Sequence, residues 1–275
     1  MPLSSQFLSH FESLTDPRQK NPHLKRHLLS DILVLTILAV ICGADSWVEI
    51  EEFGEEKQEW LQTFLTLKHG IPSHDTLGRV FASLSTRELE ECFIHWVHSL
   101  VQVSDGNIIA VDGKTVRGSR KTQKGQKPKA IHMVSAWASQ QNMVLGQRQV
   151  DGKSNEITAI PELLKMLELS GAVVTIDAMG CQRKIAAQII EQGGDYVLSV
   201  KDNQGVLHQE IARLFEKVEE KNWQAIWHKQ AETVDGGHGR AETRRYSVLP
   251  VMYCPWLVSQ KWRGVAKLGD GRENR

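Results

Sequence analysis

The sequence predicts an α/β protein in which a mixed β-sheet flanked by helices follows an all-α N-terminal domain. Three observations support this fold class. Apolar residues recur at three- and four-residue steps up to about residue 100, short β-type runs begin near residue 107, and helical and strand patterns alternate from about residue 156 onward. A cluster of turn-forming residues at 104–107 separates the first two patterns, so we expect one domain over 1–103 and a second over 104–275.

The N-terminal domain is expected to consist of helices. The spacing of apolar residues predicts helices over 28–39 and 77–84. Ser73 precedes the second of these, where its hydroxyl is expected to cap the free backbone N–H groups. The most apolar run, residues 32–44, is too short to cross a bilayer, so we expect a buried helix and no contact with a membrane.

The C-terminal domain is expected to begin with three strands. These runs cover residues 107–116, 130–139 and 143–150. Their close spacing favours an antiparallel meander. Helices and strands then alternate over 156–169 (helix), 172–178 (strand), 182–192 (helix), 195–200 (strand) and 203–221 (helix). Three meandering strands followed by two strands with intervening helices form the ribonuclease H-like order.

Charge and cysteine content limit the classes of function. Lys and Arg number 33 and Asp and Glu number 33, so the formal net charge is zero and any binding to nucleic acid must come from local clusters of positive charge. The four cysteines are far apart and form no CxxC pair. That pattern favours reduced thiols, and with no secretory signal in the N-terminal segment we expect a cytoplasmic protein.

Two aspartates in apolar strands are the strongest candidates for chemistry. Asp112 lies in IIAVDG and Asp177 ends VVTIDA. A carboxylate in a central strand costs free energy unless a metal, a partner or a site requires it. In a ribonuclease H-like sheet the first and fourth strands are neighbours, so the two side chains can share Mg²⁺ or Mn²⁺ and support phosphodiester chemistry. The alternative is that each aspartate caps a turn, since Asp112-Gly113 is a turn-type dipeptide.

Positive charge gathers in the segment between the first two predicted strands. Residues 114–129 contain no acid and carry seven basic residues, Lys114, Arg117, Arg120, Lys121, Lys124, Lys127 and Lys129. Beside an acidic site, this segment is suited to bind a phosphate backbone. The alternative is a solvated loop with no ligand.

Several segments resemble those of a known family, the bacterial insertion-sequence transposases of the DDE type, specifically the ISAs-type or H-repeat-associated group. The N-terminal part is similar through DPRQKNPHLKRHLLSDILVLTILAVICGADSWVEIEEFGEEKQEWL and GIPSHDTLGRVF. The C-terminal part is similar through VDGKTVRGS, VDGKSNEITAIPELL, TIDAMGCQ and DYVLSVKDNQ, in that order. The resemblance implies a helical domain that binds DNA and a catalytic ribonuclease H-like domain.

The resemblance also implies roles for individual residues. Asp112 and Asp177 become the first and second acids of a catalytic triad that binds Mg²⁺ or Mn²⁺. Five further residues become candidates for binding DNA or supporting the site: Lys114, Lys153, Asn155, Lys201 and Asn203. The implied partners are transposon ends and target DNA, with a homodimer forming on the DNA.

The third acid of the family has no counterpart here. In the family it is a glutamate in a His-Trp-x-x-Glu-Asn motif on a helix, whereas this sequence ends in LGDGRENR. The chain therefore resembles a truncated or frameshifted copy with an out-of-frame tail, and we expect weak or no strand transfer. Glu242 is an internal candidate for the third acid, although strand pairing or substrate contact is favoured for it. Glu273 in the tail is not favoured.

Three functions remain open from the sequence. The first is a DDE transposase that hydrolyses transposon ends and transfers strands. The second is a DNA-binding remnant or regulator of transposition without catalysis, and the third is a host nuclease on the same fold.

Overall fold

The computed structural model divides into two compact units, Met1–Gln102 and Val103–Arg275, which we call the helical unit and the sheet unit. The structure describes residues 7–18, 25–100, 106–116, 119, 130–150, 156–224, 226–237, 240–260, 262–274. In the part so described, no helix is long and apolar enough to cross a membrane.

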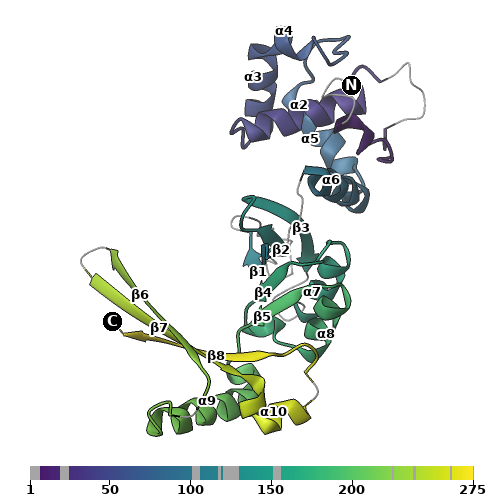
Figure 1. Ribbon diagram of the computed structural model, residues 1–275. Helices are drawn as coiled ribbons and strands as arrows, with labels where there is room; N and C mark the ends of the chain where they lie inside the picture. Colours follow the sequence, from purple (N-terminus) through teal and green to yellow (C-terminus); the bar gives the residue numbers. More distant parts are fainter. Residues whose placement is uncertain are drawn as a thin grey trace, which may run out of the picture. The chain divides into compact units, whose positions relative to one another are not determined.

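The helical unit is built around the helix that the apolar run predicts. Its elements are α2 (Leu29–Ile41), α3 (Trp47–Glu56), α4 (Gln58–Leu61), α5 (His74–Ser83) and α6 (Thr86–Leu100) (Figure 1). Ile32 and Leu35 of α2 pack with Leu61 and Leu77 in one fully buried cluster. Asp31 is also buried in α2, where its carboxylate accepts hydrogen bonds from the Leu67 and Thr66 backbone amides at 3.0 and 3.4 Å. These bonds offset the cost of burying the charge.

The Ser73 hydroxyl, which was expected to cap α5, forms a different hydrogen bond. Ser73 is the N-cap residue, but its side chain caps no backbone N–H. Instead, the Ser73 hydroxyl lies 3.1 Å from the Thr76 hydroxyl. The prediction of a capping hydroxyl was therefore wrong, because the Thr76 side chain one turn later offers a competing partner.

The sheet unit contains the predicted mixed five-stranded sheet. Its strands are β1 (Ile108–Thr115), β2 (His132–Ala138), β3 (Met143–Val150), β4 (Val173–Ile176) and β5 (Asp195–Leu198). Their order is β3-β2-β1-β4-β5, with antiparallel pairing from β1 to β3 and parallel pairing from β1 through β4 to β5. This arrangement confirms the ribonuclease H-like fold, preceded by helices, that the sequence predicts.

Helices α7 (Glu156–Lys165) and α8 (Arg183–Glu191) pack on one face of this sheet. Ile109 and Val111 of β1 are buried there, in keeping with the alternation of a half-buried strand. Helix α7 ends at Lys165, four residues before the predicted end. The amides of Met166 and Leu167 bond three residues back, to Leu163 and Leu164, which tightens the last turn and ends the α-helix.

The opposite face of the sheet exposes apolar side chains. Strand pairing places Ala110 beside Trp137 and Thr175 beside Val197, and the same alternation puts Ile108 on this face. Ile108, Trp137 and Val197 are 44%, 38% and 61% exposed. Asp112 lies two residues beyond Ala110, so it belongs to this exposed face.

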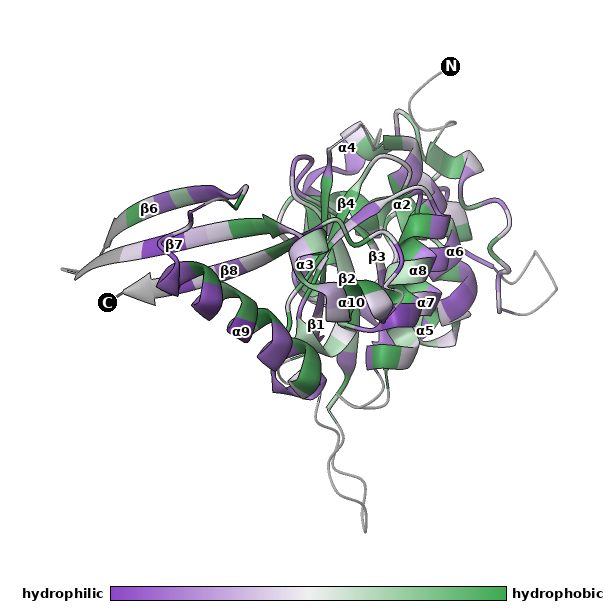
Figure 2. Ribbon diagram, turned by 60° about the horizontal axis from the view of Figure 1, so that its bottom comes forward, coloured by the Kyte–Doolittle hydropathy of each residue, from purple (hydrophilic) through white to green (hydrophobic). Residues whose placement is uncertain are grey.

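A second sheet follows. Its strands are β6 (Lys229–Gly237), β7 (Arg240–Pro250) and β8 (Lys267–Asn274), and β6 and β7 form a long hairpin that projects away from the first sheet (Figure 1). Helices α9 (Gly205–Glu220) and α10 (Pro255–Ser259) pack with its base in one core, which contains Phe215, Leu249, Leu257 and Leu268. Figure 2 shows hydrophobic and hydrophilic residues alternating along α9, as expected for a helix with one buried face.

The tail of the sequence belongs to this second sheet. Strand β8 pairs with β7 from Lys267, opposite Pro250, to Asn274, opposite Thr243. The segment that the sequence presents as an out-of-frame tail is therefore a strand, and its Leu268 is part of the core of the sheet unit.

All four cysteines are free; Cys42 is exposed and the other three are buried.

Candidate active site

The two candidate acids lie at the same edge of the two central strands. The parallel pairing of β1 with β4 runs from Ile108 opposite Val173 to Val111 opposite Ile176. Asp112 and Asp177 are the next residues on the two chains. Because neighbouring strands lie about 4.8 Å apart, this register places the two residues next to each other at the carboxyl end of the parallel pair. Both residues are exposed, so a ligand has access to them.

Asp112 sits within a continuous strand. It pairs with Ser135 of β2, and Gly113 and Lys114 continue the same ladder, so the Asp-Gly dipeptide forms no turn. Lys114 forms an ion pair with the Asp112 carboxylate, with Nζ 3.8 Å from Asp112 Oδ2. Both side chains are well exposed, which makes this a weak, solvent-screened pair. The Asp112 carboxylate therefore remains available to bind a ligand.

Asp177 is held by the turn that follows β4. Its Oδ1 accepts a hydrogen bond from the Met179 backbone amide at 3.0 Å, which caps the short 3₁₀ helix η3 (Ala178–Gly180). The sequence also allowed Asp177 to be a turn cap, and this hydrogen bond is such a cap. The bond uses one carboxylate oxygen and fixes the orientation of the side chain.

Asn203 supports the same turn. It lies in η4 (Asp202–Gln204), and its amide Nδ2 donates to the Ala178 carbonyl at 2.5 Å. The neighbouring Gln204 side chain donates to the Cys181 carbonyl at 2.9 Å. These two bonds tie the turn after β5 to the turn that carries Asp177. Burial raises the pKa of the Cys181 thiol to about 11, so this thiol is protonated at neutral pH and unsuited to act as a nucleophile.

A buried hydrogen-bonded chain lies under the end of β1. The carboxylate of Glu156, the first residue of α7, accepts from His132 Nε2 at 2.5 Å, and His132 Nδ1 lies 3.1 Å from the Thr115 hydroxyl. His132 and Glu156 are 2% and 8% exposed. A Cβ atom at Gly113 would lie 2.6 Å from Glu156 Oε1, so a larger residue at this position would displace the Glu156 carboxylate.

The hydrogen bonds among Thr115, His132 and Glu156 were not predicted from the sequence. A histidine within the apolar run AIHMVSA and a glutamate at a helix start were the available signals, because a buried ionisable group requires a partner. Their pairing was not visible, since the two residues belong to different elements. These hydrogen bonds join α7 to β1 and β2 beside Asp112.

The remaining predicted residues fall into three groups. Lys201 is exposed and precedes η4, while Glu242 lies in β7 opposite Asp235, in a different sheet from Asp112 and Asp177. Glu273 lies in β8 opposite Arg244. The other predicted DNA-binding residues lie outside the described residues: Arg117, Arg120, Lys121, Lys124, Lys127, Lys129, Lys153, Asn155. Among the described residues, no group of three His, Cys, Asp or Glu side chains could hold a metal ion.

Comparisons with known proteins show which sequences this chain is similar to. The chain is 44% identical over 263 residues to "Putative transposase YncI" of Escherichia coli O157:H7, covering 95% of this chain and 65% of that protein. It is 41% identical over 263 residues to "H repeat-associated putative transposase YhhI" of Escherichia coli K12, covering 96% and 68%. A protein from the dhlA 3′ region of Xanthobacter autotrophicus is 43% identical, with 94% and 85% covered. The chain thus spans about two thirds of the length of the first two relatives.

Two family matches cover most of the sequence. Residues 8–97 match the family described as DDE_Tnp_1-associated, and residues 103–253 match the family described as Transposase DDE domain. The second match alone covers more than half of the 275 residues. The chain therefore belongs to the transposase DDE domain family.

Proposed function

We propose that the chain is a DNA transposase that hydrolyses phosphodiester bonds at transposon ends and joins the freed 3′-hydroxyl to target DNA. The observation that carries this proposal is the parallel register of β1 and β4, which ends at Val111 and Ile176 and leaves Asp112 and Asp177 side by side. The family membership supports transposition as the process in which this site acts.

The two aspartates fit a divalent ion of the Mg²⁺ or Mn²⁺ type. Both ligands are carboxylates, the donor class that these hard cations prefer. Asp177 keeps Oδ2 free of the cap, and Asp112 forms only a screened contact with Lys114. A divalent ion bound there supplies the activation of a water or 3′-hydroxyl and the stabilisation of the leaving oxygen.

Residues around the two aspartates then bind and orient the DNA. Lys114 is highly exposed beside Asp112, where its ammonium can contact a backbone phosphate. Lys201 is exposed at the start of η4, and Asn203 acts through the turn, because its amide holds the Ala178 carbonyl next to Asp177. We assign the basic residues between β1 and β2 and those before α7 to DNA contacts as well.

The test is metal-dependent cleavage by Asp112→Asn. This change keeps the size of the side chain but removes the charge that a metal requires. With Mg²⁺ or Mn²⁺, cleavage of a duplex carrying the transposon end should fall by more than the 10–100-fold typical of residues that only support a ligand. Gel analysis of end-labelled duplex measures this rate.

Asp195→Asn is the matched control. Asp195 is an exposed aspartate of the same sheet, but it begins β5, at the edge opposite to the two candidate acids. Its variant should cut like the unchanged chain. Equal cleavage by the Asp112 variant and the unchanged chain would show that the metal site is wrongly assigned. Equal cleavage of a duplex with a scrambled end would indicate a nuclease in place of a transposase.

A second function, DNA binding without catalysis, is favoured by one observation. No third metal-binding side chain joins Asp112 and Asp177 among the described residues. Two carboxylates hold a second metal ion poorly, so we expect little strand transfer from this chain of 275 residues. Binding to end DNA as a homodimer, with no product in a strand-transfer assay, would support a regulator; efficient concerted insertion of two ends would contradict it.

A further inference from the structure

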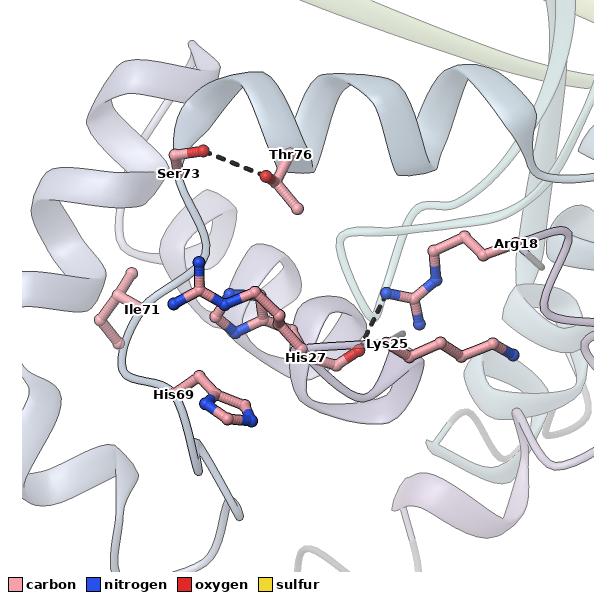
Figure 3. Close-up of a pocket in the computed structure, with 8 residues that line it drawn as sticks. Arg18, Lys25, His27, His69, Ile71, Ser73 and Thr76 are labelled. Atoms are coloured by element: carbon pink, nitrogen blue, oxygen red, sulfur yellow. Dashed lines mark hydrogen bonds between the residues drawn. The ribbon is translucent and has the colours of Figure 1, made fainter. Parts of the chain in front are cut away.

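A basic pocket lies in the helical unit. It has a volume of about 440 Å³, and five of its lining residues are basic: Arg18, Lys25, Arg26, His27, His69. Two segments form it, the stretch that leads into α2 and the stretch from His69 to Thr76 that leads into α5 (Figure 3). None of these residues was predicted individually as a DNA contact, because the two segments that form the pocket are more than forty positions apart along the chain.

One side of the pocket is fixed by Arg18. Its guanidinium donates to both carboxylate oxygens of Asp16, and its Nη1 donates to the His27 carbonyl at 2.8 Å (Figure 3). Lys25 Nζ also contacts Asp16, at 2.9 Å. Asp16 thus offsets one of these two positive charges. The contacts hold the segment that carries His27 against the pocket before any ligand binds, which lowers the entropic cost of binding.

The rest of the pocket has donors without partners. Arg26 is exposed and forms no hydrogen bond or ion pair with any described residue. The buried Nδ1 atom of His27 likewise has no hydrogen-bond partner in that part of the chain. The Ser73 and Thr76 hydroxyls, which bond each other, line the opposite wall (Figure 3). A guanidinium, an imidazole nitrogen and two hydroxyls together suit an anion with several oxygens.

The local charge points to the same class of ligand. The pKa of His27 is lowered, first by burial and then by the positive charges of Arg26, His69 and Arg18, while Asp31 acts in the opposite direction. A positive field of this kind attracts an anion, and the negative charge of a bound anion would raise the pKa of His27 again. The pocket is wider than a single phosphate, so a phosphate within a chain can enter with part of its sugar.

We propose that this pocket binds a backbone phosphate of DNA. Arg26 and the hydroxyls of Ser73 and Thr76 contact the phosphate, and the His27 side chain lines the pocket beside them. Phosphate contacts of this kind position a duplex without reading its sequence. That the phosphate belongs to DNA rests on the proposed function, whereas the anion site rests on the pocket itself.

The test compares Arg26→Ala with Lys68→Ala in the full chain. Arg26 and Lys68 are both exposed, so neither change is expected to unfold the unit, and Lys68 precedes His69 but does not line the pocket. Fluorescence anisotropy measures affinity for a labelled duplex over a range of salt concentrations. We expect Arg26→Ala to weaken binding about 5–10-fold and to reduce the slope of log affinity against log salt by about one. Lys68→Ala should stay within about twofold.

A titration with inorganic phosphate distinguishes a pocket that binds a phosphate of DNA from one that binds a free anion. Histidine side-chain resonances in nuclear magnetic resonance spectra should shift for His27 on addition of phosphate in the unchanged chain and much less in Arg26→Ala. If phosphate shifts His27 but Arg26→Ala binds DNA normally, the pocket holds a free anion and the assignment to DNA is overturned. Equal loss of affinity in both variants, or no DNA binding by the unchanged chain, overturns it too. If the transposase assignment is wrong but the pocket binds DNA, DNA affinity will depend on Arg26 and no metal-dependent cleavage will occur. The two failures can therefore be distinguished.

Discussion

At the scale of single residues, removal of the Glu156 side chain should destabilise the protein. It is buried and accepts the hydrogen bond of an equally buried histidine. Glu156→Ala leaves His132 without its partner in a site closed to water, which costs about 1–3 kcal/mol of unfolding free energy. Denaturant unfolding followed by tryptophan fluorescence measures this loss.

Glu162→Gln on the same helix is the control for that experiment. Glu162 also has a cationic partner, since its Oε1 lies 2.6 Å from Lys165 Nζ, but both side chains are more than half exposed. Exposed pairs contribute about 0–1 kcal/mol, so the change should have little effect. Similar destabilisation by the two variants would mean that the buried chain is not a stabilising feature.

The two candidate acids were predicted from the sequence, whereas the buried pair beside them was not. An aspartate inside an apolar strand departs from the local pattern, so Asp112 and Asp177 were predicted one by one. Glu156 begins an ordinary amphipathic helix, and nothing in that pattern shows which strand residue it will meet. The contact with His132 joins positions 24 apart in the chain.

At the scale of elements, the stretch before α2 depends on Asp16. Hydrogen bonds from Arg18, followed by one from Lys25, hold the pKa of the Asp16 carboxyl well below its ordinary value of 3.8, against a smaller opposing effect of burial. A carboxyl whose pKa is lowered by folding stabilises the folded chain above about pH 4, and the stabilisation is lost as the pH falls further.

Asp16→Asn should therefore lower the stability of the helical unit at pH 7, by about 1–2 kcal/mol for charge-assisted hydrogen bonds. The difference between variant and unchanged chain should shrink as the pH falls from 4 towards 2. Thermal melting of both chains across this range tests the sign. A difference that grows on acidification would show that the ion pairs are not its source.

Several elements show where local patterns are sufficient and where they fail. The five strands of the first sheet follow the predicted runs closely, because alternation of apolar residues is a local property. The early end of α7 and the pairing of β8 do not follow from local pattern. Strand β8 contains GDGREN, which has little strand propensity, and it forms because β7 offers a free edge from Thr243 to Pro250.

At the scale of the whole molecule, the division into two units predicts independent folding of the first. The cores formed by Ile32, Leu35 and Leu77, and by Phe11 and Cys92, contain residues of the helical unit alone. A fragment of residues 1–102 should therefore show helical circular dichroism and a cooperative melt. Ile32→Ala, which opens a cavity in this core, should lower the unfolding free energy of the fragment by about 2–5 kcal/mol.

A surface variant provides the comparison. Val48→Ala removes an exposed apolar side chain from α3 and should change the stability of the fragment by no more than about 0.5 kcal/mol. A fragment that melts without cooperativity, or that responds alike to both variants, would show that the helical unit needs the rest of the chain.

The sequence by itself predicted the order of helices and strands, the ribonuclease H-like class and the two strand aspartates. The periodicity of apolar residues and a charged residue within an apolar strand are local signals. Only the tertiary structure determined which residues surround these elements and the two aspartates. The buried His132–Glu156 pair, the bond from Asn203 to the turn of Asp177, and the pocket that gathers Arg26 with His69 all join segments distant in sequence. Such contacts depend on how elements pack, and packing follows from the shape of the whole core and not from the residues of any one segment.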